Sequence, residues 1–281
     1  MTTLLVLLIT MIPILPVKNN DTIKTMTFNI RYGTANDGDN SWNHRKDMVF
    51  KVVRDSDCDF IGLQEAMVFQ IEEILDNCPS YRYFGVTREV DPTEGEASPI
   101  LYNASEWEMT EGQTLWLSET PEMPGSRSWN SSLPRVFTWG RFHHKENNSE
   151  ILIINTHYDH ISEEARLNSS RVIIDHIFST TKGTGTILLG DFNASEDQRP
   201  VTYLTTNPVQ PLIDVYRSIH KVPDEKDMTF YGWQEHKTGT GKRLDYIFCT
   251  GGLVPLSSGV VDFNIGGRYP SDHMPVIAEF K

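Results

Sequence analysis

Polar side chains able to do chemistry stand beside many of the short hydrophobic runs in this 281-residue chain. At any single position the simplest interpretation is structural, because a carboxylate or amide at a strand end usually caps a turn. Their repetition favours a shared site at one edge of a sheet. An edge lined with carboxylates, amides and imidazoles suits hydrolysis of a phosphoester with a hard divalent cation. The residues concerned are Asn29, Glu65, His157, Asp191, Asn193, Asp245, Asp272 and His273.

The hydrophobic runs that would position these residues have the pattern of β-strands. Near the N-terminus Met26, Phe28 and Ile30 alternate with polar residues, and a two-residue period is typical of a strand. Asn29 closes this run, and Glu65 closes the next one along the chain. By the same criteria we expect strands at 23–30, 60–65, 81–86, 98–102, 136–143, 150–157, 186–190, 243–249 and 274–280.

Three segments have helical spacing of apolar residues instead. They cover residues 44–56, 68–75 and 164–181, and Pro79 ends the second. Strands outnumber helices and occur both in runs and singly between helices. This order excludes a strict βαβ barrel and favours stacked sheets with helices outside. Without an internal repeat, charge block or Gly/Ser linker, residues 18–281 are predicted to form a single domain.

The polar motifs resemble those of the endonuclease/exonuclease/phosphatase superfamily, and they occur in that superfamily's order. The resemblance covers Met26 to Phe280, and GDFN followed by a terminal SDH is a specific pair. It implies a deoxyribonuclease-like α/β fold, a four-layer sandwich of two mixed β-sheets packed face to face with helices outside. The chain looks like the NTHxDH-bearing branch that is common among exported proteins. The motifs are TMTFNIR, IGLQE, NTHYDH, LLGDFNAS, RLDYIF and YPSDHMPV.

The resemblance implies a Mg²⁺ cofactor, with Mn²⁺ as a substitute. Glu65 of the LQE motif matches the family's metal-binding glutamate. Asn29 and Asp272 match positions beside the metal, where they ligate it directly or through water. This sparse set is reasonable because Mg²⁺ keeps several waters and takes few carboxylates.

The resemblance also assigns catalytic roles. Asp191 matches the residue that orients or deprotonates the attacking water, and Asn193 matches one that holds a phosphate oxygen. His273 is the second candidate base or, when protonated, a phosphate clamp, and Asp245 would fix its tautomer and raise its pKa. His157 matches a position that contacts the scissile phosphate, as a donor or as the acid for the leaving group. Family members differ over whether the aspartate or the histidine is the base, and both alternatives stay open here.

Further polar residues in the loops have a structural and a functional interpretation. Such residues usually cap a turn or face solvent. Arg45 and Arg166 are nevertheless candidate phosphate contacts, because a guanidinium matches the geometry of a phosphate. Asp159 and His160 continue the NTHYDH motif, and Glu96 lies in the segment GEASPILYN. All five are candidate substrate contacts.

The charge of the chain limits its substrates. Thirty-eight acidic and 25 basic residues give a net charge of −13, which disfavours a protein that holds duplex nucleic acid through many phosphates. The favoured function is therefore a Mg²⁺-dependent phosphodiesterase or phosphatase acting on a small or flexible phosphoester. The alternatives are a nuclease, including a deadenylase-like one, and a non-catalytic binding module. A nuclease would need a local basic strip, formed if Arg45, Arg135, Arg141 and Arg166 converge.

The first 17 residues carry no charge and contain an apolar run. The segment is shorter than the roughly 20 residues of a membrane span and has the length of a secretory signal peptide. We expect a secreted or periplasmic, monomeric protein whose mature domain has no stable membrane insertion. Three cysteines are too few for a disulfide scaffold. They allow one disulfide and one thiol, but three buried thiols are favoured, at Cys58, Cys78 and Cys249.

Overall fold

The computed structural model describes residues 22–181, 183–233 and 241–281. The predicted signal peptide, residues 1–17, lies outside the described residues. The strands are β1 (Ile23–Asn29), β2 (Phe60–Gln64), β3 (Tyr81–Phe84), β4 (Ile100–Asn103), β5 (Trp107–Trp116), β6 (Val136–His144), β7 (Glu150–His157), β8 (Gly185–Asp191), β9 (Ile213–Asp214), β10 (Asp245–Cys249), β11 (Pro255–Val260) and β12 (Val276–Phe280). The helices are α1 (Trp42–Ser56), α2 (Val68–Asn77), α3 (Glu163–Thr180), α4 (Arg199–Thr206) and α5 (Val215–Ile219), with 3₁₀ turns at Gly38–Asn40 and Glu225–Asp227.

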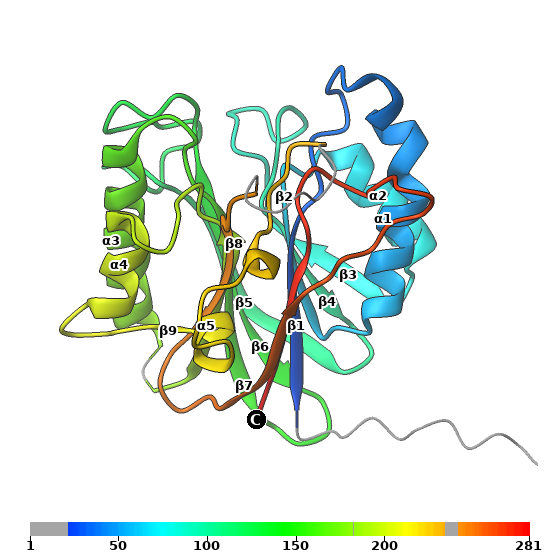
Figure 1. Ribbon diagram of the computed structural model, residues 1–281. Helices are drawn as coiled ribbons and strands as arrows, with labels where there is room; N and C mark the ends of the chain where they lie inside the picture. Colours follow the sequence, from blue (N-terminus) through cyan, green and yellow to red (C-terminus); the bar gives the residue numbers. More distant parts are fainter. Residues whose placement is uncertain (1–21, 182, 234–240) are drawn as a thin grey trace, which may run out of the picture.

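The strands form two mixed six-stranded sheets. Their strand orders are β11-β12-β1-β2-β4-β3 and β5-β6-β7-β8-β10-β9. In the first sheet β1 runs parallel to β2, and in the second β7 runs parallel to β8. The sheets face each other, with α1 and α2 outside the first and α3 and α4 outside the second (Figure 1). The predicted four-layer α/β sandwich is confirmed.

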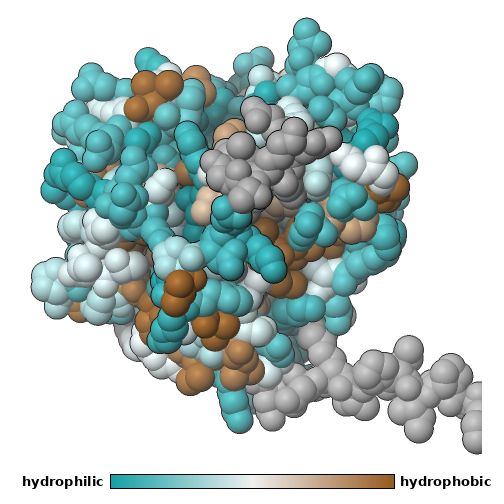
Figure 2. Space-filling view, in the orientation of Figure 1, coloured by the Kyte–Doolittle hydropathy of each residue, from teal (hydrophilic) through white to brown (hydrophobic). Residues whose placement is uncertain are grey.

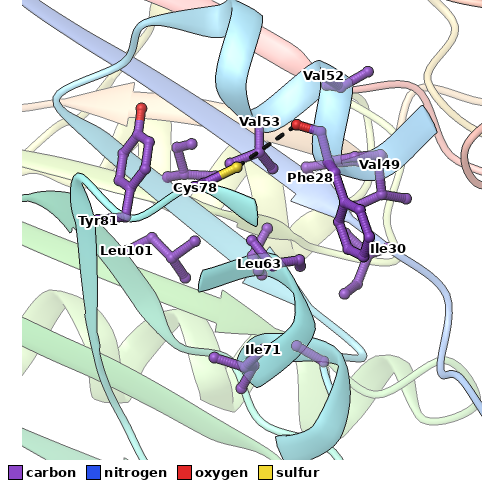
Figure 3. Packing of buried hydrophobic residues seen from close by; sticks show 14 of the residues in the cluster. Phe28, Ile30, Val49, Val52, Val53, Leu63, Ile71, Cys78, Tyr81 and Leu101 are labelled. Carbon is purple, nitrogen blue, oxygen red and sulfur yellow. Dashed lines mark hydrogen bonds between the residues drawn. The ribbon is translucent and has the colours of Figure 1, made fainter. Parts of the chain in front are cut away.

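Apolar side chains fill the three spaces between these layers. Strand β7 shows how: Leu152 and Ile154 pack toward α3, whereas Ile153 packs into the space between the sheets. Its run is continuously apolar because both faces are buried. On the other side, Phe28 of β1 and Val49 of α1 belong to the cluster beneath α1 and α2 (Figure 3). Successive side chains of a strand thus pack on opposite faces of its sheet.

The predicted strands and helices are all present, with ends shifted by at most two residues. Five elements were missed, namely β5, β9, β11, α4 and α5. Strand β5 lacks a clear two-residue period because the pairing register shifts between Met109 and Glu111. Elements as short as β9 and α5 have too few residues to show any period.

A buried polar bridge joins the two sheets close to the ends of β2 and β7. Asn155 of β7 donates from Nδ2 to the carbonyl oxygens of Leu63 (2.7 Å) and Pro99 (2.8 Å). Its Oδ1 accepts from Nε2 of Gln64 on β2 at 2.7 Å. A Cβ on Gly62 would lie 2.6 Å from the Asn155 Oδ1 atom, so glycine is required for this approach. The glutamine of LQE and the asparagine of NTH therefore hold the sheets together.

Replacing Asn155 by alanine is expected to lower the free energy of unfolding by about 2–4 kcal/mol. The change removes three buried hydrogen bonds. It takes a donor from the Leu63 and Pro99 carbonyl oxygens, each at about 1–3 kcal/mol before relaxation, whereas Gln64 Nε2 keeps its bonds to Thr27 and to the Gly62 carbonyl. Urea denaturation measures the loss. The control is Asn77→Ala at an exposed position, where Nδ2 bonds only the Glu73 carbonyl and we expect a change within about 0.5 kcal/mol. Equal effects at the two positions would contradict a structural role for the bridge.

The exposed surface is mostly hydrophilic on the face shown in Figure 2, with apolar side chains gathered near its lower end. Ile219 of α5 and Leu256 of β11 are among the exposed apolar residues. This end is opposite the edge at which β1, β2, β7 and β8 finish (Figure 1). Among the described residues, no helix combines the length and hydrophobicity required to cross a membrane. All three cysteines are buried free thiols, as favoured from the sequence.

Candidate active site

The strand directions bring the predicted residues to one rim. Parallel strands end at the same edge, so Asn29 at the end of β1 lies beside the chain that leaves β2 toward Glu65. On the second sheet His157 and Asp191 are register partners at the ends of β7 and β8. Strand β10 is antiparallel to β8 and begins with Asp245, opposite Asp191. Six separate segments thus contribute to one site, including the loop before β12 that carries Asp272 and His273.

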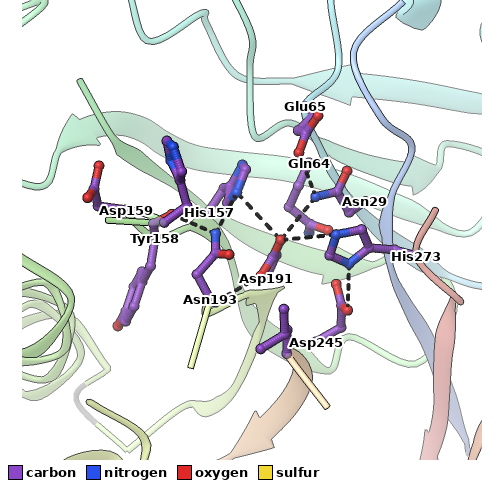
Figure 4. A network of polar contacts seen from close by, with 12 residues as sticks. Asn29, Gln64, Glu65, His157, Tyr158, Asp159, Asp191, Asn193, Asp245 and His273 are labelled. Atoms are coloured by element: carbon purple, nitrogen blue, oxygen red, sulfur yellow. Dashed lines mark hydrogen bonds and ion pairs between the residues drawn. The ribbon is translucent and has the colours of Figure 1, made fainter. Parts of the chain in front are cut away.

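Asp191 lies at the centre of the site (Figure 4). Its Oδ2 accepts from Asn29 Nδ2 at 3.0 Å and lies 3.5 Å from His157 Nε2 and 3.7 Å from His273 Nε2. Its Oδ1 accepts from the backbone N–H of Asn193 at 2.9 Å. Burial, followed by the nearby Asp245 carboxylate, raises the pKa of Asp191 to about 7, although His273 acts in the opposite direction. This carboxylate is therefore a much better proton acceptor than an exposed one.

His273 is paired with Asp245 beneath Asp191. Nδ1 of His273 lies 2.9 Å from Oδ2 of Asp245, which also accepts from Thr229 Oγ1 at 2.6 Å. Burial alone would lower the pKa of His273, but the Asp245 and Asp191 carboxylates together raise it to about 10. The imidazole is thus held protonated, with Nε2 directed toward Asp191. The contribution of Thr229 was missed because nothing in its local sequence marks it.

Glu65, Asn29 and Asp272 form the adjoining part of the rim. The Glu65 carboxylate accepts from Asn29 Nδ2 (3.1 Å) and from the backbone N–H of Tyr32 (3.1 Å). Arg31 lies between the two acids, with guanidinium nitrogens 3.9 Å from oxygens of Glu65 and Asp272. The backbone of Glu65 is left-handed, with φ of 56°, a conformation uncommon outside glycine and frequent at functional sites.

This group of oxygens fits a hard divalent cation. Burial raises the pKa of Asp272, and the nearby Glu65 carboxylate raises it further, while His273 and Arg31 act against this. Two acids held close together at a cavity wall are stabilised by a bound cation. The side-chain amide oxygen of Asn29, in contrast, accepts a hydrogen bond from the backbone N–H of Arg31. Asn29 therefore orients the two carboxylates Glu65 and Asp191, and its direct or water-mediated contact with a metal stays a prediction.

A second group of potential metal ligands consists of Asp191, Asp245 and His273, whose ligand atoms lie within 4.8 Å of one another. Here the Asp245 carboxylate and the His273 ring already bond each other. Magnesium prefers oxygen ligands in a nearly octahedral arrangement, and a buried imidazole does not meet that preference. On chemical grounds the Glu65 and Asp272 side of the rim is the better cation site.

His157 and Asn193 complete the wall around Asp191. Asn193 donates from Nδ2 to His157 Nε2 (3.0 Å) and to the Tyr158 carbonyl (3.1 Å). Because His157 Nε2 accepts this bond, the ring is neutral, with its proton on Nδ1. Burial, together with Arg135 and Arg88, holds the pKa of His157 well below its usual range. His157 is therefore placed as a neutral contact beside Asp191.

The weaker candidates divide into two groups. His160 and Glu96 line a cavity of about 620 Å³ above Asp191, although Glu96 is also paired with Arg88 at 2.7 Å. Asp159, Arg45 and Arg166 do not line this cavity. Asp159 is buried and accepts bonds from Ser131, Ser132, Ile161 and Ser162.

Arg45 and Arg166 were predicted to contact phosphate, but both side chains instead bond backbone carbonyl oxygens of nearby loops. The Arg45 guanidinium donates to the carbonyl oxygens of Ile30, Arg31, Asn40 and Pro270. It thereby ties the end of β1 to the loop that carries Asp272. Arg166 donates to the Asp159 carbonyl at 2.9 Å. Both guanidinium groups are turned into loop packing, a direction that sequence spacing does not reveal.

Other arginines occupy the cavity wall instead. Arg31, Arg88 and Arg135 line it, together with Tyr32, Leu133 and Phe230. Of the four arginines considered for a basic strip, only Arg135 lies there, since Arg141 bonds Thr184 and the Thr180 carbonyl. Arg31 follows Asn29 in the FNIR motif, which was the available signal for it. No local signal marks Arg88.

Comparison with known proteins agrees with this site. The model of the Endonuclease/Exonuclease/phosphatase family matches residues 26–273 of this chain. The chain belongs to this family. Members of the endonuclease/exonuclease/phosphatase family are phosphoester hydrolases, so the matched region, which contains every residue of the rim, is a phosphoesterase domain by descent.

Two solved structures and one curated sequence illustrate the likeness. An endonuclease/exonuclease/phosphatase protein from Bacteroides vulgatus is 30% identical, with a TM-score of 0.86 over 92% of this chain and 98% of that one. A mannosyl-6-phosphatase from Bacteroides thetaiotaomicron is 29% identical, with a TM-score of 0.84 over 92% and 99% of the two chains. An uncharacterized protein of Acanthamoeba polyphaga mimivirus is 25% identical over 257 residues, or 85% of this chain and 92% of that protein.

The geometry supplies the parts that the family's chemistry requires. Asp191 can accept a proton, His273 can donate to developing negative charge, and the Asn193 amide lies beside them. Preorganised donors of this kind stabilise the charge on phosphoryl oxygens because they need no reorganisation during the reaction. A hydrolytic site for a phosphoester is the chemistry that this arrangement supports.

Proposed function

We propose that the protein is a Mg²⁺-dependent phosphoester hydrolase that attacks phosphorus with an activated water. The observation that carries this proposal is the position of Asp191, between the two histidines and below the cavity that Glu65 and Asp272 also line. A general base, charged donors and a cation site thus meet at one point. That combination supports in-line hydrolysis.

The proposed roles follow from the contacts. Asp191 accepts the proton of the attacking water, because its oxygens face the cavity while its pKa is raised. His273, held by Asp245, donates to a phosphoryl oxygen, and Asn193 and His157 contact the phosphate from the other side. Mg²⁺, with Mn²⁺ as a substitute, would be held by Glu65 and Asp272 and would supply charge neutralisation at the phosphoryl group.

We propose a small or flexible phosphoester as the substrate. The cavity of about 620 Å³ and the net charge of −13 favour a compact ligand over a polyanion. The similar Bacteroides thetaiotaomicron protein is a mannosyl-6-phosphatase, which supports a small phosphoester without fixing its identity. A non-catalytic binding module is disfavoured, because Glu65, Asp191, Asn193, Asp245 and His273 are all present and connected at the rim.

The N-terminal segment supports a proposal on location. We propose that residues 1–17 direct export, that residues 18–281 form the single mature domain, and that the chain is a secreted or periplasmic, monomeric member of the NTHxDH-bearing branch. The support is the uncharged apolar run before residue 18 and the NTHYDH motif. N-terminal sequencing of protein recovered from the culture medium or periplasm tests export, and recovery only from the cytoplasm would contradict it.

Metal-dependent turnover is the direct test of the proposed function. Purified protein is assayed with p-nitrophenyl phosphate and bis-p-nitrophenyl phosphate, in Mg²⁺ and in EDTA. We expect hydrolysis of at least one compound in Mg²⁺ and none in EDTA. A panel of sugar phosphates, phospholipid headgroups, phosphoinositides and nucleic acids then identifies the natural class. No turnover of any member of the panel would favour the binding module.

A nuclease remains the second candidate, and substrate length distinguishes it. We expect kcat/KM to rise by less than about 100-fold from a dinucleotide to a ten-mer, because only part of the arginine set faces the cavity and few remote phosphates can be bound. The measurement is made at two salt concentrations, since phosphate contacts weaken with salt. A larger gain, worth more than about 2.7 kcal/mol of transition-state binding, would identify a nuclease.

A further inference from the structure

Arg135 is buried beside the site with hydrogen-bonding capacity left over. It directly precedes β6, its residue is 4% exposed, and it lines the cavity next to His157. Among the described residues, its Nε and Nη1 atoms have no hydrogen-bond partner. A buried charged donor without partners is costly. Because Arg135 also lines the cavity, an anion held there would lie close to this guanidinium.

The last two residues of the NTHYDH motif hold this guanidinium in place. Nη2 of Arg135 lies 2.9 Å from Nδ1 of His160, and Nε lies 3.8 Å from Oδ2 of Asp159. Asp159 is itself fixed by the backbone N–H groups of Ile161 and Ser162 and by Ser132. Asp159 and His160 therefore act as positioning residues that aim Arg135, which gives the end of the motif a physical role.

Arg88 extends the cationic wall but does not compete for the same anion. Its guanidinium makes two bonds to Glu96, of 2.7 and 3.0 Å, so its charge is already balanced. Arg135 lies 3.8 Å from the Asp159 carboxylate, and the Glu96 and Asp191 carboxylates also act on its charge. Arg135 thus has two guanidinium nitrogens without a hydrogen-bond partner, whereas both terminal nitrogens of Arg88 are bonded to Glu96. The acids Glu65 and Asp272 also line this cavity.

We propose that Arg135 binds a non-bridging oxygen of the substrate's phosphoryl group and makes the enzyme prefer phosphomonoesters to phosphodiesters. This inference rests on the proposed function and specifies its substrate class. A monoester offers three non-bridging oxygens and up to two negative charges, whereas a diester offers two and one. The rim has three separate sets of contacts, namely the cation side, the His157–Asn193–His273 group and Arg135. A terminal phosphoryl group can give each set its own non-bridging oxygen, whereas a diester has one such oxygen too few.

The first test measures anion binding without metal or turnover. The thermal unfolding midpoint is recorded in EDTA against the concentration of inorganic phosphate or dimethyl phosphate at constant ionic strength, since a ligand of the folded state raises it. We expect phosphate to stabilise the wild-type protein more than dimethyl phosphate, and its apparent affinity to fall at least about tenfold in Arg135→Gln, as for loss of a charge-assisted pair. Arg141→Gln, which alters an arginine remote from the cavity, should bind phosphate like the wild type.

The second test compares the two esters in Mg²⁺. We expect Arg135→Gln to lower kcat/KM for p-nitrophenyl phosphate by about 100-fold and for bis-p-nitrophenyl phosphate by less than about tenfold. Arg135→Lys should give a kcat/KM for p-nitrophenyl phosphate between those of the wild type and Arg135→Gln, because lysine keeps the charge but lacks the planar guanidinium. His160→Ala should lower the ratio of monoester to diester activity in the same direction, whereas a merely structural role would lower both activities equally.

The outcomes separate this inference from the proposed function. Equal loss of both esters in Arg135→Gln, or unchanged phosphate binding, would overturn the assignment. If the glutamine variant does not fold, Arg135→Lys and the wild-type comparison of the two anions decide, and equal stabilisation by both anions overturns it. Selective phosphate binding by a protein that hydrolyses no ester would support the Arg135 site and contradict the proposed function.

Discussion

Glu65→Gln is expected to lower kcat by about 10³-fold or more while leaving the fold intact. The substitution keeps the shape of the side chain but removes the negative charge that would balance a bound cation. It also keeps an oxygen that can accept the Tyr32 N–H bond. Electrostatic contributions to phosphoryl transfer are of this size because they act on charge that develops in the transition state.

Metal titration decides whether this loss arises through the cation. Excess Mg²⁺ or Mn²⁺ should restore part of the activity of Glu65→Gln, since a weakened site fills at higher concentration. Glu72→Gln, at an exposed position of α2, is the matched control and should behave like the wild type. Thermal unfolding confirms that both variants fold. Full wild-type turnover in EDTA would refute the cation site altogether.

The His273–Asp245 pair is expected to behave as one catalytic unit. Asp245→Asn and His273→Gln should each lower kcat by about 10²–10⁴-fold, the usual range for a positioned acid or base. The double variant should lose no more than about tenfold beyond the larger single loss, because residues that act together are non-additive. The 2.9 Å contact between the ring and the carboxylate is the structural basis for this expectation.

The double-mutant cycle needs two checks. His143→Gln changes a histidine of β6 that bonds Asn148, and it should leave kcat unchanged. Circular dichroism and thermal unfolding must show that the Asp245 variant folds, because it leaves His273 buried beside Asp191. Losses that add in log units would show that the two residues work independently and would remove the paired role.

The sequence alone determined where the chemistry-bearing residues stand relative to the strands. Met26, Phe28 and Ile30 have a local two-residue period, and Asn29 and Glu65 follow directly from such runs. Burial of alternate residues forces a strand, and parallel neighbours then finish at the same edge. The motifs, in family order, also identified the rim residues and the fold, because they span nearly the whole matched region.

Only the tertiary structure decided which polar groups contact one another. Arg45 and Arg135 were both considered as phosphate-binding arginines, yet Arg45 is bonded to four carbonyl oxygens, whereas Arg135 lines the cavity and has two nitrogens without a hydrogen-bond partner. The Thr229 bond to Asp245 joins segments 16 residues apart, and the Gln64–Asn155 bridge joins different sheets. The direction of a side chain and the burial that shifts its pKa arise from distant packing partners. Local sequence periodicity therefore predicts a strand, but it does not predict which distant residues will pack against that strand.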